Sequence, residues 1–441
     1  MATSKLNTNM KSSNSIKVVF ISLLLDLLAF TMILPLLPSL LEHYRLNDST
    51  GLYNWLSVRV KVFQEIVGAP EKFTSVLFGG FLGSMFSFLQ FVASPLVGSV
   101  SDVVGRKTVM IICLVGISFS YVLWALSSNL IIFILARFIG GISKGNVSLS
   151  MAIITDVSSI ENRGKGMALV GIAFSLGFIL GPLIGAAFAV WAKSRTGQWY
   201  IFPALFAFLL SITDVLFVIL FFEESLPKEK RAKSFSSSFK NAESLINIKN
   251  LFKFSAVNNT KETNLKDLRK LGLIYFVYLF IYSGLEFTLT FLTHHVFNYS
   301  SMEQGWMFFI IGFIMAVIQG GFVRRIPETK IKNTAILGLW LIVPSFICIG
   351  LAKGLLLLYI GLFLFAASTA LVVPCIMTLA SLQGSVQEKG TVMGIFRSLG
   401  ALARALGPIV ASVAFWSIGS CSTYLIGSVC LLWPVMSLKR M

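Results

Sequence analysis

Seven ionisable side chains lie inside stretches of the chain that are otherwise apolar. Placing a charge at the centre of a lipid bilayer costs about 2.5–3.5 kcal/mol per residue on insertion scales, so such residues are candidates for function. The acids among them can carry protons, and the arginines can hold a carboxylate or sulfate through two parallel hydrogen bonds. The seven are Asp26, Arg137, Lys144, Asp214, Glu286, Arg397 and Arg404.

Two pairs of cations among these residues have the same spacing. Arg137 and Lys144 are seven residues apart, and so are Arg397 and Arg404. Seven residues complete nearly two helical turns, so each pair shares one helix face with about 10 Å between its members. A shared face is expected if both side chains look into one aqueous cavity. We therefore predict that Arg397, Arg404 and Arg137 bind an anionic substrate.

The acids are the candidates for proton coupling. We predict this role for Asp26 and Glu286, because protonating either one makes the cavity more positive and favours an anion. That scheme is proton–anion symport. Antiport, in which substrate and proton compete for one carboxylate, also remains open. Asp26 and Arg137 could instead form a buried ion pair that only locks two helices. Asp214 is expected to be structural, and Lys144 is expected in a cytoplasmic gate.

Three uncharged polar side chains are further candidates for lining the cavity. They lie in the second, seventh and eighth apolar stretches, and each also fits ordinary helix packing. His294 and His295 fit either an exposed loop pair or a lumenal pH sensor. The three polar candidates are Gln90, Tyr282 and Gln319.

The composition indicates what kind of element must hold these residues. The chain has 441 residues, of which 56% are hydrophobic and 12% are charged. A soluble domain carries about 25% charged residues, so this composition excludes a soluble enzyme and a nucleic-acid binder. It indicates a helical protein that crosses a lipid bilayer several times. The net charge of +17 then raises the question of which side of the membrane holds the excess.

Long apolar stretches supply the helices that must position the charges. A membrane-spanning helix needs about 20 predominantly apolar residues. The first stretch has no cleavage site after it, so it indicates a retained span rather than a signal peptide. Twelve stretches qualify, near 18–41, 74–98, 108–127, 130–152, 166–190, 200–222, 271–293, 304–323, 333–352, 355–380, 390–415 and 421–437. The predicted parts are a cytoplasmic N-terminus at 1–17, an N-terminal six-helix bundle at 18–222, a cytoplasmic linker at 223–270, a C-terminal six-helix bundle at 271–437 and a cytoplasmic C-terminus at 438–441.

Basic residues are distributed unevenly between the two sides of these helices. Twenty-five lysines and arginines fall on the side of both termini, and seven fall on the other side. An excess of basic residues marks the cytoplasmic side, so both termini are predicted to be cytoplasmic. The plasma membrane and an internal membrane both fit this asymmetry. Sequons for glycosylation at Asn47 and Asn298 fall on the opposite side.

The predicted linker at 223–270 fits a solvated tether, or a membrane-surface helix near 241–255.

The two predicted bundles contain a repeated segment. The pair Gly181-Pro182 ends a segment that recurs 226 residues later and ends there in the pair Gly407-Pro408. Repeated six-helix halves indicate a transporter whose substrate site lies at their interface, near the middle of the membrane. We predict that these four residues take part in gating.

A short polar turn follows the second apolar stretch and contains Gly98, Asp102, Gly105, Arg106 and Lys107. The glycines supply a tight backbone, Asp102 is expected to cap the neighbouring helix, and the basic pair is expected to anchor at the interface. The spacing G-x3-D-x2-G-R-K resembles a signature of the major facilitator superfamily. The resemblance implies a gating role for this turn.

Other spans resemble further signatures of that superfamily. Residues 137–146 resemble the fourth-span motif, in which an arginine is linked to proton coupling. Residues 177–185 resemble the fifth-span motif of the drug:proton antiporter branch, although Ala168 and Ala186 stand where that pattern prefers glycine. An aspartate at the position of Asp26 is also common in that branch.

Additional segments are similar to an animal group of this superfamily that is named for its likeness to tetracycline efflux pumps. This resemblance implies organic-anion transport, and the group's name is not a guide to its substrate. The similar segments are 24–31, 140–150, 390–394 and 397–404.

The motifs and the composition agree on one interpretation. We predict an all-α membrane protein with the major facilitator fold, whose two six-helix bundles rock about a central cavity. The predicted function is secondary active transport of small organic anions, coupled to protons or driven by exchange, and not an enzymatic activity. A proton-coupled efflux antiporter for drugs or amphiphiles and a transporter-shaped receptor without turnover remain alternatives. We expect a monomer without a cofactor. We also expect no metal site, because the five cysteines lack the spacing of a zinc site.

Overall fold

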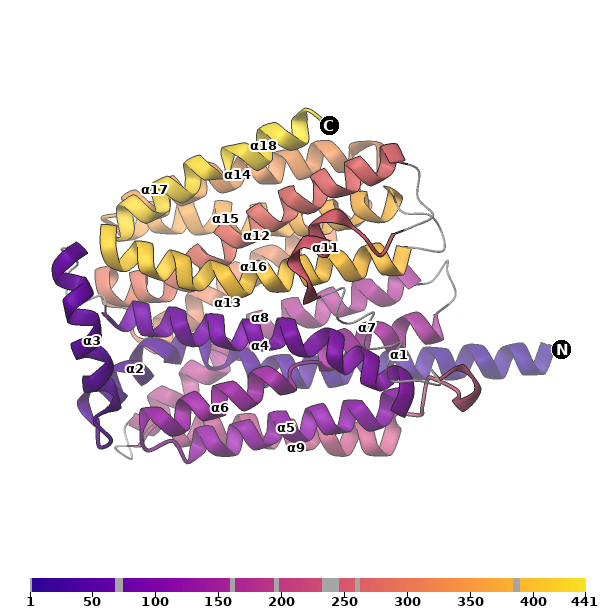
Figure 1. Ribbon diagram of the computed structural model, residues 1–441, viewed down its shortest axis with the longest axis horizontal. Helices are drawn as coiled ribbons and strands as arrows, with labels where there is room; N and C mark the ends of the chain where they lie inside the picture. The colour runs from indigo at the N-terminus through magenta and orange to yellow at the C-terminus, as the bar shows by residue number, and fades with distance from the viewer. Residues whose placement is uncertain are drawn as a thin grey trace. The chain divides into compact units, whose positions relative to one another are not determined.

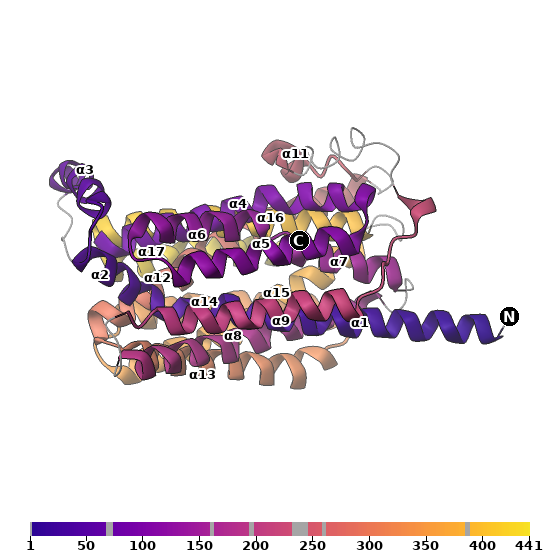
Figure 2. The ribbon, with the colours of Figure 1, turned by 90° about the horizontal axis from the view of Figure 1, so that it is seen from below.

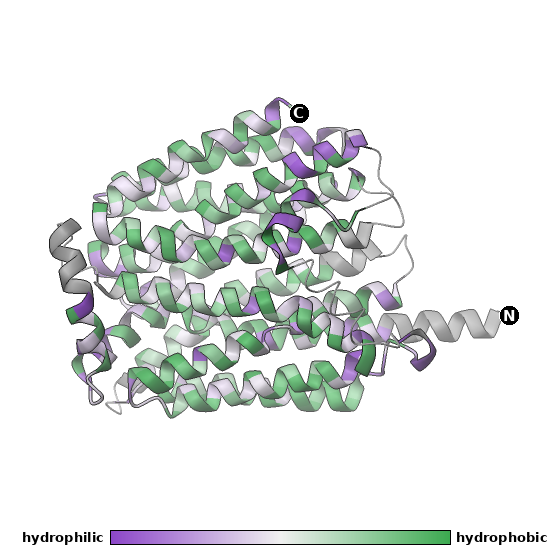
Figure 3. Ribbon diagram, viewed as in Figure 1, coloured by the Kyte–Doolittle hydropathy of each residue, from purple (hydrophilic) through white to green (hydrophobic). Residues whose placement is uncertain are grey.

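The computed structural model describes residues 2–67, 74–158, 163–193, 198–231, 246–257, 262–383 and 389–441. Within these ranges the chain forms helices and no β-strand. Twelve helical segments of the described chain are long and apolar enough to cross a membrane, which confirms the predicted number of spans. Figure 3 shows that apolar residues dominate along the lengths of these helices. The protein is therefore a multi-pass, all-α membrane protein.

The chain folds into two compact units. Unit 1 contains Met1–Leu36 and Leu89–Ile246, and unit 2 contains Leu37–Phe88 and Asn247–Met441. Unit 2 thus takes in a segment from the first half of the sequence. The bundle boundaries predicted from the sequence remain a prediction.

The helices of unit 1 are α1 (Ala2–Thr31), the second part of α4 (Thr74–Val104), α5 (Arg106–Ala125), α6 (Leu130–Ser143), α7 (Asn146–Val157), α8 (Arg163–Lys193) and α9 (Ile201–Phe221). In this unit α1 packs against α8 and α9, and α5 packs against α6 and α9 (Figure 1). The α-helix of the first span ends before Pro35 and Pro38, because a proline cannot donate a backbone hydrogen bond. A 3-10 turn at Leu34–Leu36 follows.

The fourth span is broken in its middle. α6 ends at Ser143, and α7 begins at Asn146, so Lys144 and Gly145 form the junction. A Cβ atom at position 145 would lie 2.6 Å from the Val97 side chain of α4. A glycine is therefore needed here for the junction to approach α4.

The helices of unit 2 are α2 (Leu37–Leu46), α3 (Leu52–Val67), the first part of α4, α11 (Ile248–Lys253), α12 (Glu262–Phe297), α13 (Ser301–Gly321), α14 (Ile331–Leu351), α15 (Leu355–Gln383), α16 (Lys389–Ile418), α17 (Ser420–Cys430) and α18 (Leu432–Lys439). In this unit α12 packs along α16, and α14 packs along α15 (Figure 1). Figure 2 shows the same helices after a turn of 90°. Ser300 and Glu303 form a reciprocal capping box that begins α13.

Glycines bring the first part of α4 close to two long helices of unit 2. A Cβ atom at Gly79 would clash with the ring of Phe291 on α12, and one at Gly80 would clash with the Ser412 side chain of α16. Small residues at helix contacts allow close backbone approach in membranes. This packing explains why residues 37–88 group with unit 2.

Part of the predicted linker is docked on unit 2. Within the described residues 246–257, α11 begins at the side-chain cap of Asn247 and ends at Phe254, which adopts a left-handed conformation with φ 54°. The Phe254 ring is buried, with its centroid 5.6 Å from that of Phe396 on α16. Residues 241–245 of the helix predicted near 241–255 lie outside the described residues. α11 packs on α12 and α16. α12 begins at Glu262, so it extends into the region predicted as the linker.

Candidate functional site

An acidic and a basic side chain form a buried pair inside unit 1. Lys144, at the junction of α6 and α7, donates from Nζ to both carboxylate oxygens of Asp26 on α1, at 2.6 and 2.7 Å. Asn146, the first residue of α7, donates from Nδ2 to the same carboxylate at 2.7 Å. All three side chains are buried. The break in the fourth span therefore places two donors on one carboxylate.

This arrangement offsets the cost of burying the charges. Removing two ions from water costs several kcal/mol per ion, which is offset only by close attraction with further hydrogen bonds. The ring of Phe30 adds a cation–π attraction, because Lys144 Nζ lies 4.7 Å and Arg137 Cζ lies 5.9 Å from its centroid. In place of the suggested pair of Asp26 with Arg137, the structure pairs Asp26 with Lys144. The proposed gating role of Lys144 stays a prediction.

The fifth-span motif forms a close contact between α8 and α1. The Thr31 hydroxyl donates to the Gly177 carbonyl at 2.7 Å. A Cβ atom at Gly181 would clash with Thr31 and would lie 2.9 Å from the Leu28 carbonyl oxygen. Pro182 follows inside α8, where it removes one backbone hydrogen bond of the helix. The motif therefore holds these helices together, and its gating role stays a prediction.

The corresponding helices of unit 2 make a similar contact. A Cβ atom at Gly407 on α16 would clash with the Phe280 carbonyl oxygen and would lie 2.5 Å from the Ser283 hydroxyl of α12. Pro408 follows Gly407 inside α16, as Pro182 follows Gly181 inside α8. The repeat seen in the sequence thus corresponds to a repeated helix contact.

An acid in unit 2 has an aromatic environment. Glu286 on α12 accepts a hydrogen bond from the Tyr282 hydroxyl at 2.9 Å. The Tyr282 ring stacks on Phe365 of α15 at 5.0 Å and on Tyr278 at 5.6 Å. Tyr282 therefore packs against two aromatic rings. Its exposed fraction is 6%, and its hydroxyl is engaged by Glu286.

Two arginines lie seven residues apart on α16. In the described part of the chain, neither Arg397 nor Arg404 makes a hydrogen bond or ion pair. Arg404 is close enough to Glu286 to act on it through its charge, and both arginines act in this way on Tyr275 of α12. Arg397 is half-buried and Arg404 is exposed. A guanidinium group without an ion-pair partner can bind a carboxylate or a sulfate through two hydrogen bonds.

The polar turn between α4 and α5 is held by ion pairs around one arginine. Arg106 donates from Nε to Asp156 of α7 at 2.9 Å, and its Nη1 lies 2.7 Å from an Asp102 carboxylate oxygen. Gly105 has a φ of 115°, which a side chain would strain. Gly98 has open space around it. The turn therefore ties the end of α7 to the beginning of α5.

The cap of α5 differs from the expectation. Asp102 does not cap this helix, because its carboxylate pairs with Arg106. Instead Glu224, after α9, accepts hydrogen bonds from the backbone N–H groups of Arg106 and Lys107 at 2.9 and 3.3 Å. A carboxylate at a helix N-terminus stabilises the helix through unpaired donors and the dipole. Arg231 fixes the same acid at 3.4 Å and donates to the Val104 carbonyl at 2.7 Å.

The remaining predicted residues occupy separate positions. Gln90 is half-buried on α4 in unit 1, and Gln319 is half-buried on α13 in unit 2. His294 lies in the last turn of α12 and interacts through Nδ1 with the Tyr299 carbonyl at 3.2 Å, so it is not in a free loop. Burial raises the pKa of Tyr299, which therefore stays a neutral donor, and its hydroxyl lies 3.3 Å from that of Tyr359.

Three polar residues that the structure singles out are not among the residues predicted from the sequence. Asn146 and Asp156 bracket α7 and bind charged groups on other helices. Glu224 stands out in the sequence only as an acid in a basic stretch. Asp214, which is expected to be structural, is completely buried.

The chain matches known proteins along most of its length. A family model described as Major Facilitator Superfamily matches residues 19–408. Human Major facilitator superfamily domain-containing protein 10 is 46% identical over 433 residues, which cover 97% of this chain and 92% of that relative. Tetracycline resistance protein, class B, of Escherichia coli is 25% identical over 406 residues, with coverages of 91% and 89%. The crystal structure of the human organic anion transporter MFSD10 (TETRAN) has a TM-score of 0.81 and 45% identity, and the match covers 97% of this chain and 99% of that one.

Proposed function

This chain belongs to the Major Facilitator Superfamily of membrane transporters, and we propose that it moves small organic anions across a membrane by alternating access. The observation that carries the proposal is the pair of arginines on α16, Arg397 and Arg404, which have no ion-pair partner among the described residues. A cation inside a span is costly unless it is neutralised, and a bound anion neutralises it. A crystal structure of a human organic anion transporter matches this chain at 45% identity, which supports the same substrate class.

Proton coupling follows from the charges near these arginines. Glu286 carries a negative charge within electrostatic reach of Arg404 and competes with an anion for it. Protonation of Glu286 removes that competition, so a proton and an anion favour each other's binding. The proposed cycle is therefore proton–anion symport, with Glu286 as the proton carrier close to the substrate and Asp26 as the proton carrier of unit 1.

The proposed orientation places both termini in the cytoplasm. The turn of Asp102, Gly105 and Arg106 then also faces the cytoplasm, because it follows the second span. The uneven distribution of basic residues supports this orientation. If this orientation is correct, a protease or an impermeant lysine reagent applied to sealed cells should reach residues 223–270 only after the cells are permeabilised.

The test is uptake of labelled organic anions into proteoliposomes, with and without an inward proton gradient. We expect uptake that the gradient increases. The double variant Arg397→Ala/Arg404→Ala should reduce it about ten-fold or more, because each charge-assisted hydrogen bond contributes about 1.5–3 kcal/mol. Arg440→Ala, an exposed arginine outside the spans, is the matched control. Uptake that is unchanged in the double variant would contradict the proposal.

A second candidate is proton-coupled efflux of amphiphilic drugs by antiport. Its support is the similarity to the tetracycline resistance protein of Escherichia coli and the glycine contact of α8 that resembles the antiporter motif. An outward substrate flux that an opposing proton gradient drives, for neutral or cationic amphiphiles, would favour this candidate. Absence of flux for every anion and amphiphile would favour a receptor without turnover.

A further inference from the structure

Unit 1 contains a second buried acid, on α9. Asp214 lies in the middle of α9, and its exposed fraction is 0%. Among the described residues, neither carboxylate oxygen has a hydrogen-bond partner. Asp26, in the same unit, accepts three hydrogen bonds. Two acids in one unit therefore have opposite environments.

The polar groups around Asp214 do not complete its coordination. Ser22 of α1 faces the carboxyl group, but its hydroxyl also lacks a hydrogen bond of ordinary geometry in the described structure. Ser211, one turn earlier on α9, is already bonded to Ser118 of α5 at 2.7 Å. A rotating hydroxyl such as that of Ser22 can donate to a carboxylate or accept from a carboxylic acid.

The charged and titratable groups around Asp214 come from several helices. Asp26 of α1 and Lys144 at the α6–α7 junction act on it through their charges, with opposite signs. α8 brings no titratable side chain to this region between Leu169 and Trp191. The titratable groups of α5 are Arg106, Lys107, Cys113 and Tyr121.

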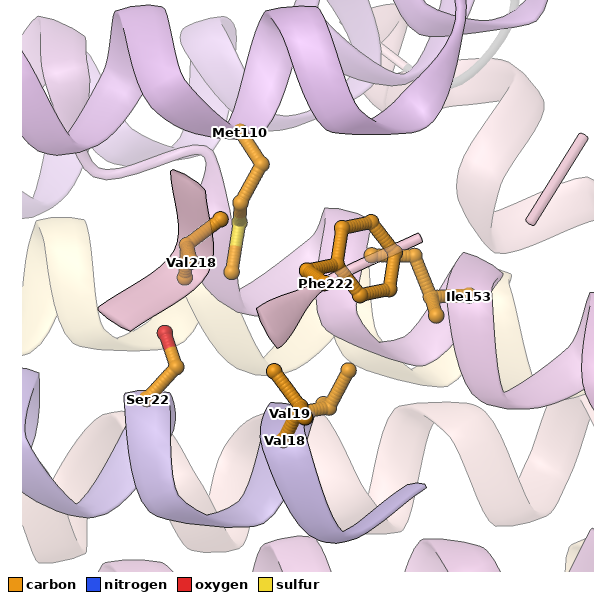
Figure 4. A pocket seen from close by; sticks show the side chains of 7 residues that line it. All are labelled: Val18, Val19, Ser22, Met110, Ile153, Val218 and Phe222. Carbon is orange, nitrogen blue, oxygen red and sulfur yellow. The ribbon is translucent and has the colours of Figure 1, made fainter. Parts of the chain in front are cut away.

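A small pocket lies one turn farther along α9 than this acid. Val218 and Phe222, one and two turns after Asp214, line it together with Ser22 and Met110, and Figure 4 shows the Ser22 hydroxyl at its edge. The pocket has no room for a water molecule in this conformation.

We infer that Asp214 is a proton-binding site of unit 1, separate from the Asp26–Lys144 pair. An ionised carboxylate buried without a partner costs several kcal/mol, and binding a proton removes that cost. The site releases its proton when movement of α1 and α9 opens the pocket to water. This inference rests on the proposed proton-coupled transport and adds a proton carrier to it.

The test is infrared difference spectroscopy of the purified full-length protein, recorded as the pH is raised. We expect a protonated-carboxyl band at neutral pH that disappears at high pH in the wild-type protein. Asp214→Asn should lack this band and should release one proton fewer over the same titration. Asp214→Glu should retain the band, and Glu229→Gln, which changes an exposed acid, should leave the spectrum unchanged.

Three outcomes would overturn the inference. The band could survive in correctly folded Asp214→Asn, it could be assigned to Asp26 by its loss in Asp26→Asn alone, or it could persist at every pH at which the protein stays folded. The last outcome would describe a permanently neutral acid that only packs. None of these measurements requires flux, so a protein that titrates at Asp214 but moves no anion would refute only the proposed transport.

Discussion

Asp26 in unit 1 and Glu286 in unit 2 are both acids inside candidate spans, and their partners differ. Asp26 is bound by Lys144 and Asn146, and its exposed fraction is 2%. Glu286 is half-buried and accepts one hydrogen bond, from the hydroxyl of Tyr282. The first acid is balanced by a fixed cation, whereas the second is in hydrogen-bond contact only with a neutral donor in the described part of the chain.

The cations of the two units show the same contrast. In unit 1, Lys144 is committed to Asp26, and both Lys144 and Arg137 lie over the ring of Phe30. In unit 2, Arg397 and Arg404 have no ion pair among the described residues. The contrast suggests that unit 1 is built to hold its charges together and that unit 2 is built to receive one from outside.

The helix scaffold is much more alike in the two units than the charges are. α1 packs against α8 through Gly181, and α12 packs against α16 through Gly407. Each glycine precedes a proline at the same place in the repeat. A shared scaffold with different charges indicates that the functional difference lies in a few side chains.

The largest expected effect is on the stability of unit 1. Lys144→Ala leaves Asp26 buried and ionised without its cation, which should cost about 3–5 kcal/mol of unfolding free energy. Denaturant unfolding of the detergent-solubilised protein measures it. Asp26→Asn/Lys144→Met should recover most of the loss, and Arg404→Ala in unit 2 should change stability by less than about 1 kcal/mol. Equal losses for Lys144→Ala and Arg404→Ala would break the contrast between the units.

The next effect is on substrate affinity in unit 2. Arg397→Ala and Arg404→Ala should each raise the KM for a transported anion by about ten- to a hundred-fold, because each loses charge-assisted hydrogen bonds. The lysine variants keep the charge and lose the planar fork, so their KM should lie between those of wild type and alanine. Initial rates of uptake measure both. If an alanine variant lowers the folded fraction and not the affinity, that arginine is structural.

A smaller effect tests the shared scaffold. Gly181→Ala and Gly407→Ala each place a Cβ atom into a neighbouring helix, which should destabilise the protein by about 1–3 kcal/mol. Gly171→Ala on α8 and Gly394→Ala on α16 meet open space, so they are matched controls and should be neutral or stabilising. Thermal unfolding compares all four. A loss in only one helix pair would show that the repeated contact is not equivalent in the two units.

The number of spans and the charges inside them could be predicted from the sequence, because apolar length alone identifies a span and an ionisable residue within it is conspicuous. The partners of those charges could not. The choice of Lys144 over Arg137 for Asp26 depends on the break between α6 and α7, which turns Lys144 toward α1. The Glu224 cap joins residues far apart in the chain, so no local pattern indicates it.

The burial of Asp214 was unpredictable for a different reason. Its place in a span follows from the sequence, but whether its helix face meets lipid, a cation or a closed pocket depends on how α1 and α5 pack around α9. The environment of one side chain on a helix is a property of packing.

The smallest effect sharpens the role of Glu286. Tyr282→Phe removes the hydrogen bond to the Glu286 carboxylate while keeping the ring that stacks on Phe365. The ionised form of Glu286 then loses stabilisation of about 1.5 kcal/mol, so the midpoint of pH-dependent uptake should move about one unit toward higher pH.

Tyr278→Phe is the matched control, because it removes a hydroxyl of the same aromatic stack that makes no hydrogen bond to Glu286. In Glu286→Gln the Tyr282→Phe substitution should no longer shift the profile. A shift that persists there would mean that Tyr282 acts on another titrating group, and the coupling would then belong to unit 1.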